Sequence, residues 1–111
     1  MVINNPQLDQ IFGALSDATR RGILMQLSQG ETNITTLAAP YQMSQPAISK
    51  HIRILEKAGL IRRAKRGREY IIQAAPEAAE QARDWIDYYA QFWREQFDDV
   101  EAYLKQTGEL R

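Results

Sequence analysis

Short hydrogen-bonding side chains and long cations share the stretch SQPAISKHIRILEKA, residues 44–58. A glutamine can pair with an adenine edge, a serine adapts to several bases, and a lysine or arginine reaches guanine or a phosphate. A small residue permits close approach and can contact a thymine methyl group. These groups are supplied by Ser44, Gln45, Ala47, Ser49, Lys50 and Arg53.

The same stretch is predicted to be a helix with a single apolar face. Ile48, Ile52 and Leu55 recur at helical spacing, and Leu60 is expected to close over them. Ser44 is a suitable N-cap for this helix. One apolar face for packing and a compact polar face near the N-terminus match the needs of a helix that enters a DNA major groove.

Residues 60–74 predict a β-hairpin with a basic tip. Two segments of strand character, residues 61–65 and 69–73, flank a flexible Gly67. Positive charge on a projecting turn is suited to backbone phosphates or to a minor groove. The candidate contacts on this hairpin are Arg63, Lys65, Arg66 and Arg68.

The remaining elements are expected to be helical. Apolar spacing predicts helices at 6–15 and 17–29, a short helix capped by Thr35 or Thr36, and a last helix at 76–106. A tight turn at 41–44 would join the third and fourth helices. This order predicts a mainly α fold with a small β-hairpin wing, the winged helix-turn-helix. We expect one domain over residues 1–111, with the helix-turn-helix at 34–58.

A net charge of zero hides an uneven distribution. Residues 1–75 carry ten Lys and Arg against five Asp and Glu, a net charge of +5, whereas residues 76–111 carry four against nine, a net charge of −5. The basic segment is what a polyanion would attract, and the acidic segment would be repelled by it. The sequence therefore predicts one face for docking on double-stranded DNA.

The last predicted helix holds seven of the chain's ten aromatic residues, spread over more than one face. A domain of this size cannot bury them all, and surplus apolar surface usually marks an interface. We expect a homodimer, which would place two recognition helices on successive major grooves. The predicted interface is Leu8, Ile11, Phe12, Trp85, Tyr89, Phe92, Trp93, Phe97 and Val100.

Composition excludes several classes of protein and site. The chain has no cysteine, so it offers no disulfide, thiolate ligand or cysteine nucleophile. No nucleophile–base set or phosphate loop is present, so we expect no enzyme and no cofactor. No long apolar run or basic leader is visible, so we expect no membrane partner and a cytoplasmic location.

Three stretches resemble the ArsR-type winged-helix transcriptional repressors: ALSDATRRGILMQL, SQPAISKHIRILEKAGLI and RRAKRGREYII. The resemblance covers about residues 5–95. It implies a homodimer that binds an operator and blocks transcription. It also implies that the positions matching Ser44, Gln45, Pro46, Ser49, Lys50 and His51 lie at or near the DNA.

Departures from the family pattern concern metal sensing. Many members carry a cysteine pair in the third helix, where this chain has NITTLAAPY, and histidine ligands in the last helix, which here has none. One histidine and no cysteine make neither site. The aromatic-rich stretch DWIDYYAQFWREQFDDVEAYL resembles a metal-independent branch of the family.

Two alternatives stay open at this point. The aromatic residues of the last helix would also suit a pocket for an organic effector at the dimer interface. The fold would also suit a protein-interaction module without DNA binding, because a fold does not fix a function.

Overall fold

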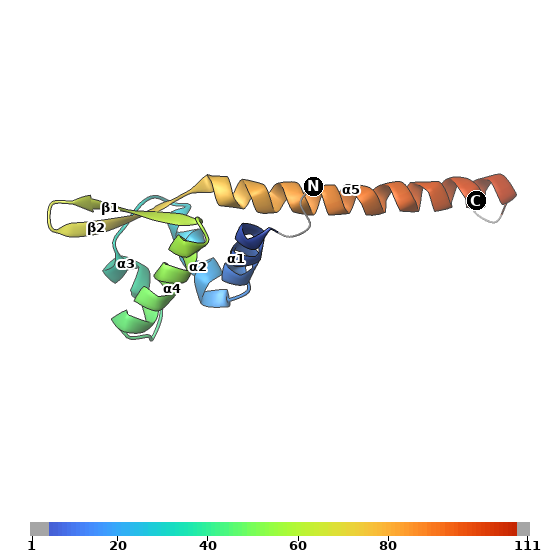
Figure 1. Ribbon diagram of the computed structural model, residues 1–111. Coiled ribbons are helices and arrows are strands. Elements are labelled where there is room, and N and C mark those ends of the chain that lie inside the picture. The colour runs from blue at the N-terminus through green and yellow to red at the C-terminus, as the bar shows by residue number, and fades with distance from the viewer. Residues whose placement is uncertain (1–4, 109–111) are drawn as a thin grey trace.

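The computed structural model describes residues 5–108 and measures 70 × 29 × 21 Å. A helical body carries a hairpin at one end and a long helix that projects from the other (Figure 1). The elements are α1 (Pro6–Leu15), α2 (Ala18–Leu27), α3 (Ile34–Ala38), α4 (Gln45–Lys57), β1 (Ile61–Arg66), β2 (Glu69–Ala74) and α5 (Pro76–Thr107). This order confirms the predicted mainly α, winged helix-turn-helix fold.

Side-chain caps determine where the four short helices begin. Each cap residue accepts a hydrogen bond from a backbone N–H of the first turn that has no partner inside the helix. The predicted cap of α3 was wrong, because Asn33 Oδ1 accepts the Thr36 N–H at 2.8 Å and Thr35 is already inside the helix. The four caps are Asn5, Asp17, Asn33 and Ser44.

The core lies between α1, α2, α3 and α4 and is closed by the base of the hairpin. The predicted apolar face of α4 is confirmed, because Ile48, Ile52 and Leu55 are fully buried and Leu60 lies over them. Within residues 5–108 no polar or charged residue is buried. The fully buried larger side chains are Ile11, Ile23, Leu37, Ile48, Ile52, Leu55 and Ile72.

The hairpin is an antiparallel pair in which Ile61 is opposite Ala74 and Arg66 is opposite Glu69. Two residues close it, and Gly67 has a φ of +63°. A two-residue turn with glycine first matches the twist of paired strands. The extended segment before α3 adds to the sheet, because Thr32 and Ile72 exchange two backbone hydrogen bonds, of 3.2 and 2.7 Å.

Helix α5 has two parts with different surroundings. Its first turns pack on the body through Ala78 and Ala82, which are buried. From residue 87 onward it runs clear of the other elements (Figure 1). Its 32 residues correspond to roughly 48 Å. None of the helices within residues 5–108 combines the length and the apolar character needed to cross a bilayer.

Candidate nucleic-acid interface

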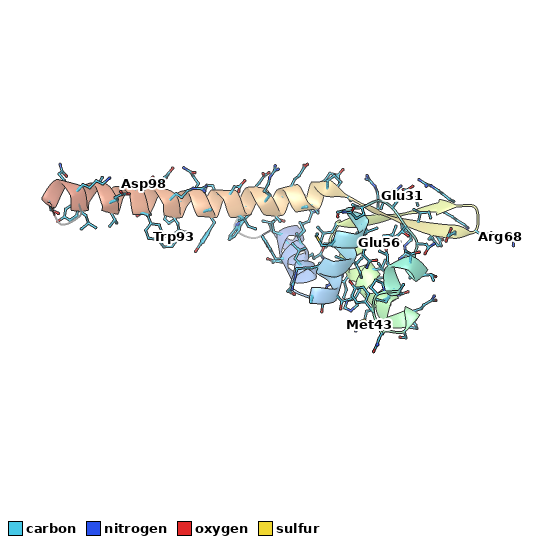
Figure 2. The ribbon with its side chains drawn as sticks, turned by 180° about the vertical axis from the view of Figure 1, so that it is seen from behind. Glu31, Met43, Glu56, Arg68, Trp93 and Asp98 are labelled. Atoms are coloured by element: carbon cyan, nitrogen blue, oxygen red, sulfur yellow. The ribbon has the colours of Figure 1, made fainter. Side chains whose placement is uncertain are left out.

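Helix α4 exposes its polar face near the N-terminus. Gln45, Pro46, Lys50 and Arg53 are exposed. Pro46, Lys50 and Arg53 share the side of the helix away from the buried isoleucines, whereas Gln45 lies in the first turn, next to α3. The turn that precedes α4 carries Met43 at the end of the body farthest from α5 (Figure 2). The exposed end of α4 is therefore free to enter a groove without obstruction from the long helix.

Other predicted residues of α4 are partly used by the fold. Ser44 Oγ accepts the Ala47 N–H at 3.3 Å, which leaves the hydroxyl hydrogen free to donate. Ala47 and Ser49 are half-buried. Gln45 Nε2 lies 3.5 Å from Thr35 Oγ1 of α3, a long contact at the exposed junction of the two helices.

His51 faces α2 rather than the open side of α4. Arg20 donates from Nη1 to His51 Nδ1 at 3.2 Å, and Asp17 Oδ2 lies 3.9 Å from the same nitrogen. Arginine can only donate, so Nδ1 is the acceptor in this hydrogen bond. Of the two roles open to His51, contact with DNA or support of the fold, this geometry favours support.

Arg20 links this histidine to the end of α1. Its Nε donates to the Ala14 carbonyl oxygen at 2.7 Å, and its Nη2 donates to the Gly13 carbonyl oxygen at 3.1 Å. Both carbonyls belong to the last turn of α1, where no i+4 partner inside the helix exists, and the guanidinium adds to the hydrogen bonds that Ser16 already donates to Gly13. The hydrogen bond that the Arg20 N–H donates to Asp17, followed by the guanidinium charge and His51, lowers the pKa of the Asp17 carboxyl.

Arg63, one of the four predicted wing contacts, is half-buried and tied to α4. Its Nε and Nη2 donate to the two carboxylate oxygens of Glu56 at 3.3 and 3.4 Å. Its guanidinium also lies 5.5 Å from the centre of the Tyr70 ring. Glu56 belongs to the last turn of α4, in the body beside the hairpin (Figure 2). Arg63 therefore joins the wing to α4.

Arg66 is tied to the segment before α3. It binds Glu31 through both terminal nitrogens, and the Nη2–Oε2 distance is 3.2 Å. Gln73 Nε2 donates to the same Glu31 oxygen at 2.7 Å. These hydrogen bonds, first from Gln73 and then from Arg66, lower the pKa of the Glu31 carboxyl.

Lys65 and Arg68 are the predicted wing cations that remain available. Within residues 5–108 neither forms an ion pair, and the same holds for Lys50 and Arg53 on α4. Arg68 lies at the tip of the hairpin (Figure 2). Lys65 Nζ lies 5.9 Å from the centre of the Tyr70 ring. The candidate interface thus has a compact set of cations on α4 and a second set at the wing tip.

A second open surface runs along α5. Trp85 packs against Phe12 of α1 with ring centres 5.8 Å apart, and a ladder of aromatic contacts continues through Tyr89 and Trp93 to Phe97. Phe97 is 68% exposed and Val100 is 55% exposed. The prediction for Ile11 was wrong, because its side chain is fully buried in the core and cannot reach a partner.

The residues that the sequence analysis missed are the carboxylates that tie the wing to the body. Glu31 and Arg66 are 35 residues apart in the chain, and Asn33 and Glu69 are 36 apart. No local pattern predicts such pairs. The sequence gives one indication: residues 1–75 carry five carboxylates among ten cations. Three of these five, Glu31, Glu56 and Glu69, bind the wing or lie on it.

A helix-turn-helix formed by α3 and α4, followed by a two-stranded wing, places this chain in the winged helix-turn-helix class. Residues 17–63 match the family model described as "Bacterial regulatory protein, arsR family". The chain is 33% identical over 97 residues to the arsenical resistance operon repressor of Escherichia coli K12. The matched region covers 86% of this chain and 80% of that protein. The chain therefore belongs to the ArsR family of transcriptional regulators, and its winged helix-turn-helix is a DNA-binding domain.

Solved structures agree with this assignment. The crystal structure of an ArsR family transcriptional regulator has a TM-score of 0.79 and 36% identity, over 85% of this chain and 97% of that one. A homodimeric winged helix-turn-helix DNA-binding domain from Mycobacterium bovis has a TM-score of 0.60 and 20% identity, over 89% of this chain and 95% of that one. At this identity the similarity supports the fold alone. The relatives are named as repressors and transcriptional regulators, which agrees with the prediction that the chain is not an enzyme.

Proposed function

We propose that this chain is a homodimeric repressor that binds a specific operator without sensing a metal ion. The observation that carries the proposal is the exposed polar end of α4, whose cations Lys50 and Arg53 form no ion pair among residues 5–108, while the opposite apolar face is fully buried. A helix anchored in this way can present base-reading side chains with little freedom to shift. The exposed wing cations Lys65 and Arg68 follow on the hairpin, the next structural unit of the chain.

Roles on this surface follow from side-chain chemistry. Gln45 and Ser49 would read base edges, and Lys50 and Arg53 would reach guanine or phosphate. Lys65 and Arg68 would neutralise phosphates next to the groove that α4 enters. The small side chains of Ser44, Pro46 and Ala47 would let the N-terminal end of α4 come close to the bases.

The homodimer is proposed from the exposed ladder on α5. Leu8 and Phe12 of α1 lie beside its first ring, and the exposed residues continue along the helix to Tyr103. Twofold pairing of residues 76–106, together with residues 6–15, would cover this apolar surface in both copies. It would also supply the second recognition helix that a palindromic operator needs.

Metal independence is proposed from the ligand inventory. The sequence has no cysteine, and its one histidine already contacts Arg20 and Asp17. Among residues 5–108 no group of three or more His, Cys, Asp or Glu side chains is placed to hold a metal ion. Soft and borderline metals prefer thiolate and imidazole ligands, which the chain does not offer in number.

A second candidate function adds an organic effector to the same repressor. A hollow of about 360 Å³ lies between α1 and α5 and is lined by Asn5, Leu8, Asp9, Phe12 and Trp85. Its aromatic walls and single carboxylate would suit a small, partly apolar cation. A repressor of this kind would release its operator when the ligand binds, whereas the simpler repressor would not.

Selection of bound sequences from random DNA tests the proposed function. We expect a palindrome, and an affinity that falls steeply between roughly 50 and 200 mM salt as phosphate contacts are lost. Gln45→Ala should relax the preference at one base pair of each half-site, whereas the control Gln91→Ala, on the exposed surface of α5, should leave it unchanged. Absence of any retained DNA would instead support a protein-interaction module.

A further inference from the structure

Three consecutive residues before α3 bond the wing. Thr32 exchanges its two backbone hydrogen bonds with Ile72, while the side chains on either side of it bind the hairpin. Glu31 accepts hydrogen bonds from Arg66 and Gln73, and Asn33 Nδ2 donates to Glu69 Oε1 at 2.7 Å. The segment 31–33 therefore contacts both strands of the wing, and Figure 2 shows Glu31 beside the hairpin.

The two arginines on either side of the hairpin turn have different surroundings. Arg66 has both terminal nitrogens on the Glu31 carboxylate, whereas Arg68 is exposed at the tip and unpaired among the described residues. A guanidinium that already binds a carboxylate with two hydrogen bonds must break them before it can bind a phosphate in the same way. Equal charge on the two residues thus does not imply equal roles on DNA.

We infer that Glu31 is a positioning residue for DNA binding, and that Arg66 acts through Glu31 instead of contacting phosphate. The segment 31–33 sets the angle of the wing, and Lys65 and Arg68 at its far end make the phosphate contacts. This inference rests on the proposed docking face of α4 and the wing. It replaces the predicted phosphate contact of Arg66 with a role in holding the wing.

The opposite account treats Glu31 as an internal competitor that withholds Arg66 from DNA. Three observations favour positioning. Glu31 keeps a hydrogen bond from Gln73 that involves no cation, the adjacent Thr32 is paired with the wing through its backbone, and Asn33 binds the wing as well. A competitor would need only the contact with Arg66.

Four variants separate the two accounts: Glu31→Gln, Arg66→Gln, their double variant and Arg68→Gln. Affinity is measured over a salt series on a selected duplex of about 30 base pairs, long enough for two half-sites. Asp98→Asn, far along α5 (Figure 2), removes the same charge as Glu31→Gln and gives the effect of net charge alone. Relative to that control, we expect Glu31→Gln to weaken binding about threefold with an unchanged salt slope.

The remaining variants supply the internal checks. The double variant should bind as Arg66→Gln does, because both changes remove one ion pair and so do not add. Arg68→Gln should reduce the salt slope by about 0.9, the value for one lost phosphate contact. Stronger binding by Glu31→Gln, or a reduced slope for Arg66→Gln, would overturn the inference in favour of the competitor.

Hydrogen exchange of the Ile72 amide tests the clamp without DNA. The Ile72 N–H donates to the Thr32 carbonyl oxygen, so its exchange reports whether the segment 31–33 holds the wing. We expect faster exchange in Glu31→Gln than in Asp98→Asn. Unchanged exchange would refute positioning whatever the DNA result, whereas wild-type protein that fails to bind any duplex would refute the proposed docking face and leave this measurement to decide the clamp.

Discussion

Helix α4 and the outer part of α5, residues 87–107, are both amphipathic but leave opposite faces open. In α4 the apolar face is buried against α1, α2 and α3, and the polar face is exposed. In the outer part of α5 the aromatic side chains are themselves exposed, with Trp93 at 44% and Phe97 at 68%. One helix has its packing partners within the chain, and the other lies beyond them.

The difference separates a reading surface from an assembly surface. A polar face exposed to water costs little free energy, and its side chains can bind a ligand. An exposed apolar face carries a free-energy cost that burial against another surface removes, at about 25 cal/mol per Å². The comparison thus predicts that changes in α4 and in α5 have effects of different kinds, and the following changes test it.

The largest expected effect is on the packing of α4. Ile52→Ala removes a fully buried side chain, so we expect the free energy of unfolding to fall by about 2–5 kcal/mol. Urea titration measures this change. Arg53→Ala, on the exposed neighbour, should stay within about 0.5 kcal/mol and lose DNA affinity instead. Equal losses of stability for the two variants would contradict the division of α4 into two faces.

The next effect concerns assembly through α5. Trp93→Asp places a charge in the aromatic ladder and should weaken dimerisation by about 2 kcal/mol or more. Sedimentation over a concentration series measures it. The matched control is Ala102→Asp, because Ala102 is exposed and nine residues later on the helix, which puts it half a turn away. A wild-type chain that sediments as a monomer at all concentrations would remove the proposed interface.

A smaller effect tests how closely the body is packed. A Cβ added at Gly22 would lie 2.1 Å from the Tyr41 hydroxyl oxygen but an ordinary 3.4 Å from the next ring atom. Gly22→Ala should therefore destabilise the wild-type protein. In a Tyr41→Phe background it should stabilise by about 0.5–1 kcal/mol, because alanine is the better helix former. Thermal unfolding of the four proteins shows whether the sign reverses.

The smallest effect is on the pH dependence of the wing. The pKa of Glu31 lies below its usual 4.5, so folding favours the ionised carboxylate. The stability that the ionised Glu31 carboxylate contributes is fully present above about pH 4.5. It is lost as the pH falls through the lowered pKa that Glu31 has in the folded protein. Exchange protection at Ile72 should therefore decrease in that acidic window, and Glu31→Gln should remove this dependence. Persistence of the dependence in Glu31→Gln would assign it to another group, such as Asp17.

Much of the fold was predictable because its signals are local. Helical spacing around Ile48, Ile52 and Leu55, a cap at Ser44 and a glycine in the hairpin turn each act within a few residues. The cap of α3 was mispredicted because Asn33, Thr35 and Thr36 are all acceptable caps within four positions. Only the backbone geometry distinguishes between such neighbours.

The candidate site was predictable in position but not in detail. The sequence alone determined which segment carries the cations and which face of α4 is apolar, since charge and periodicity are properties of the chain itself. The tertiary structure decided that Arg63 binds Glu56, that Arg66 binds Glu31, that His51 faces Arg20 and that Ile11 is fully buried. Contacts of this kind join residues that are mostly far apart in the chain, so they exist only once the elements have packed.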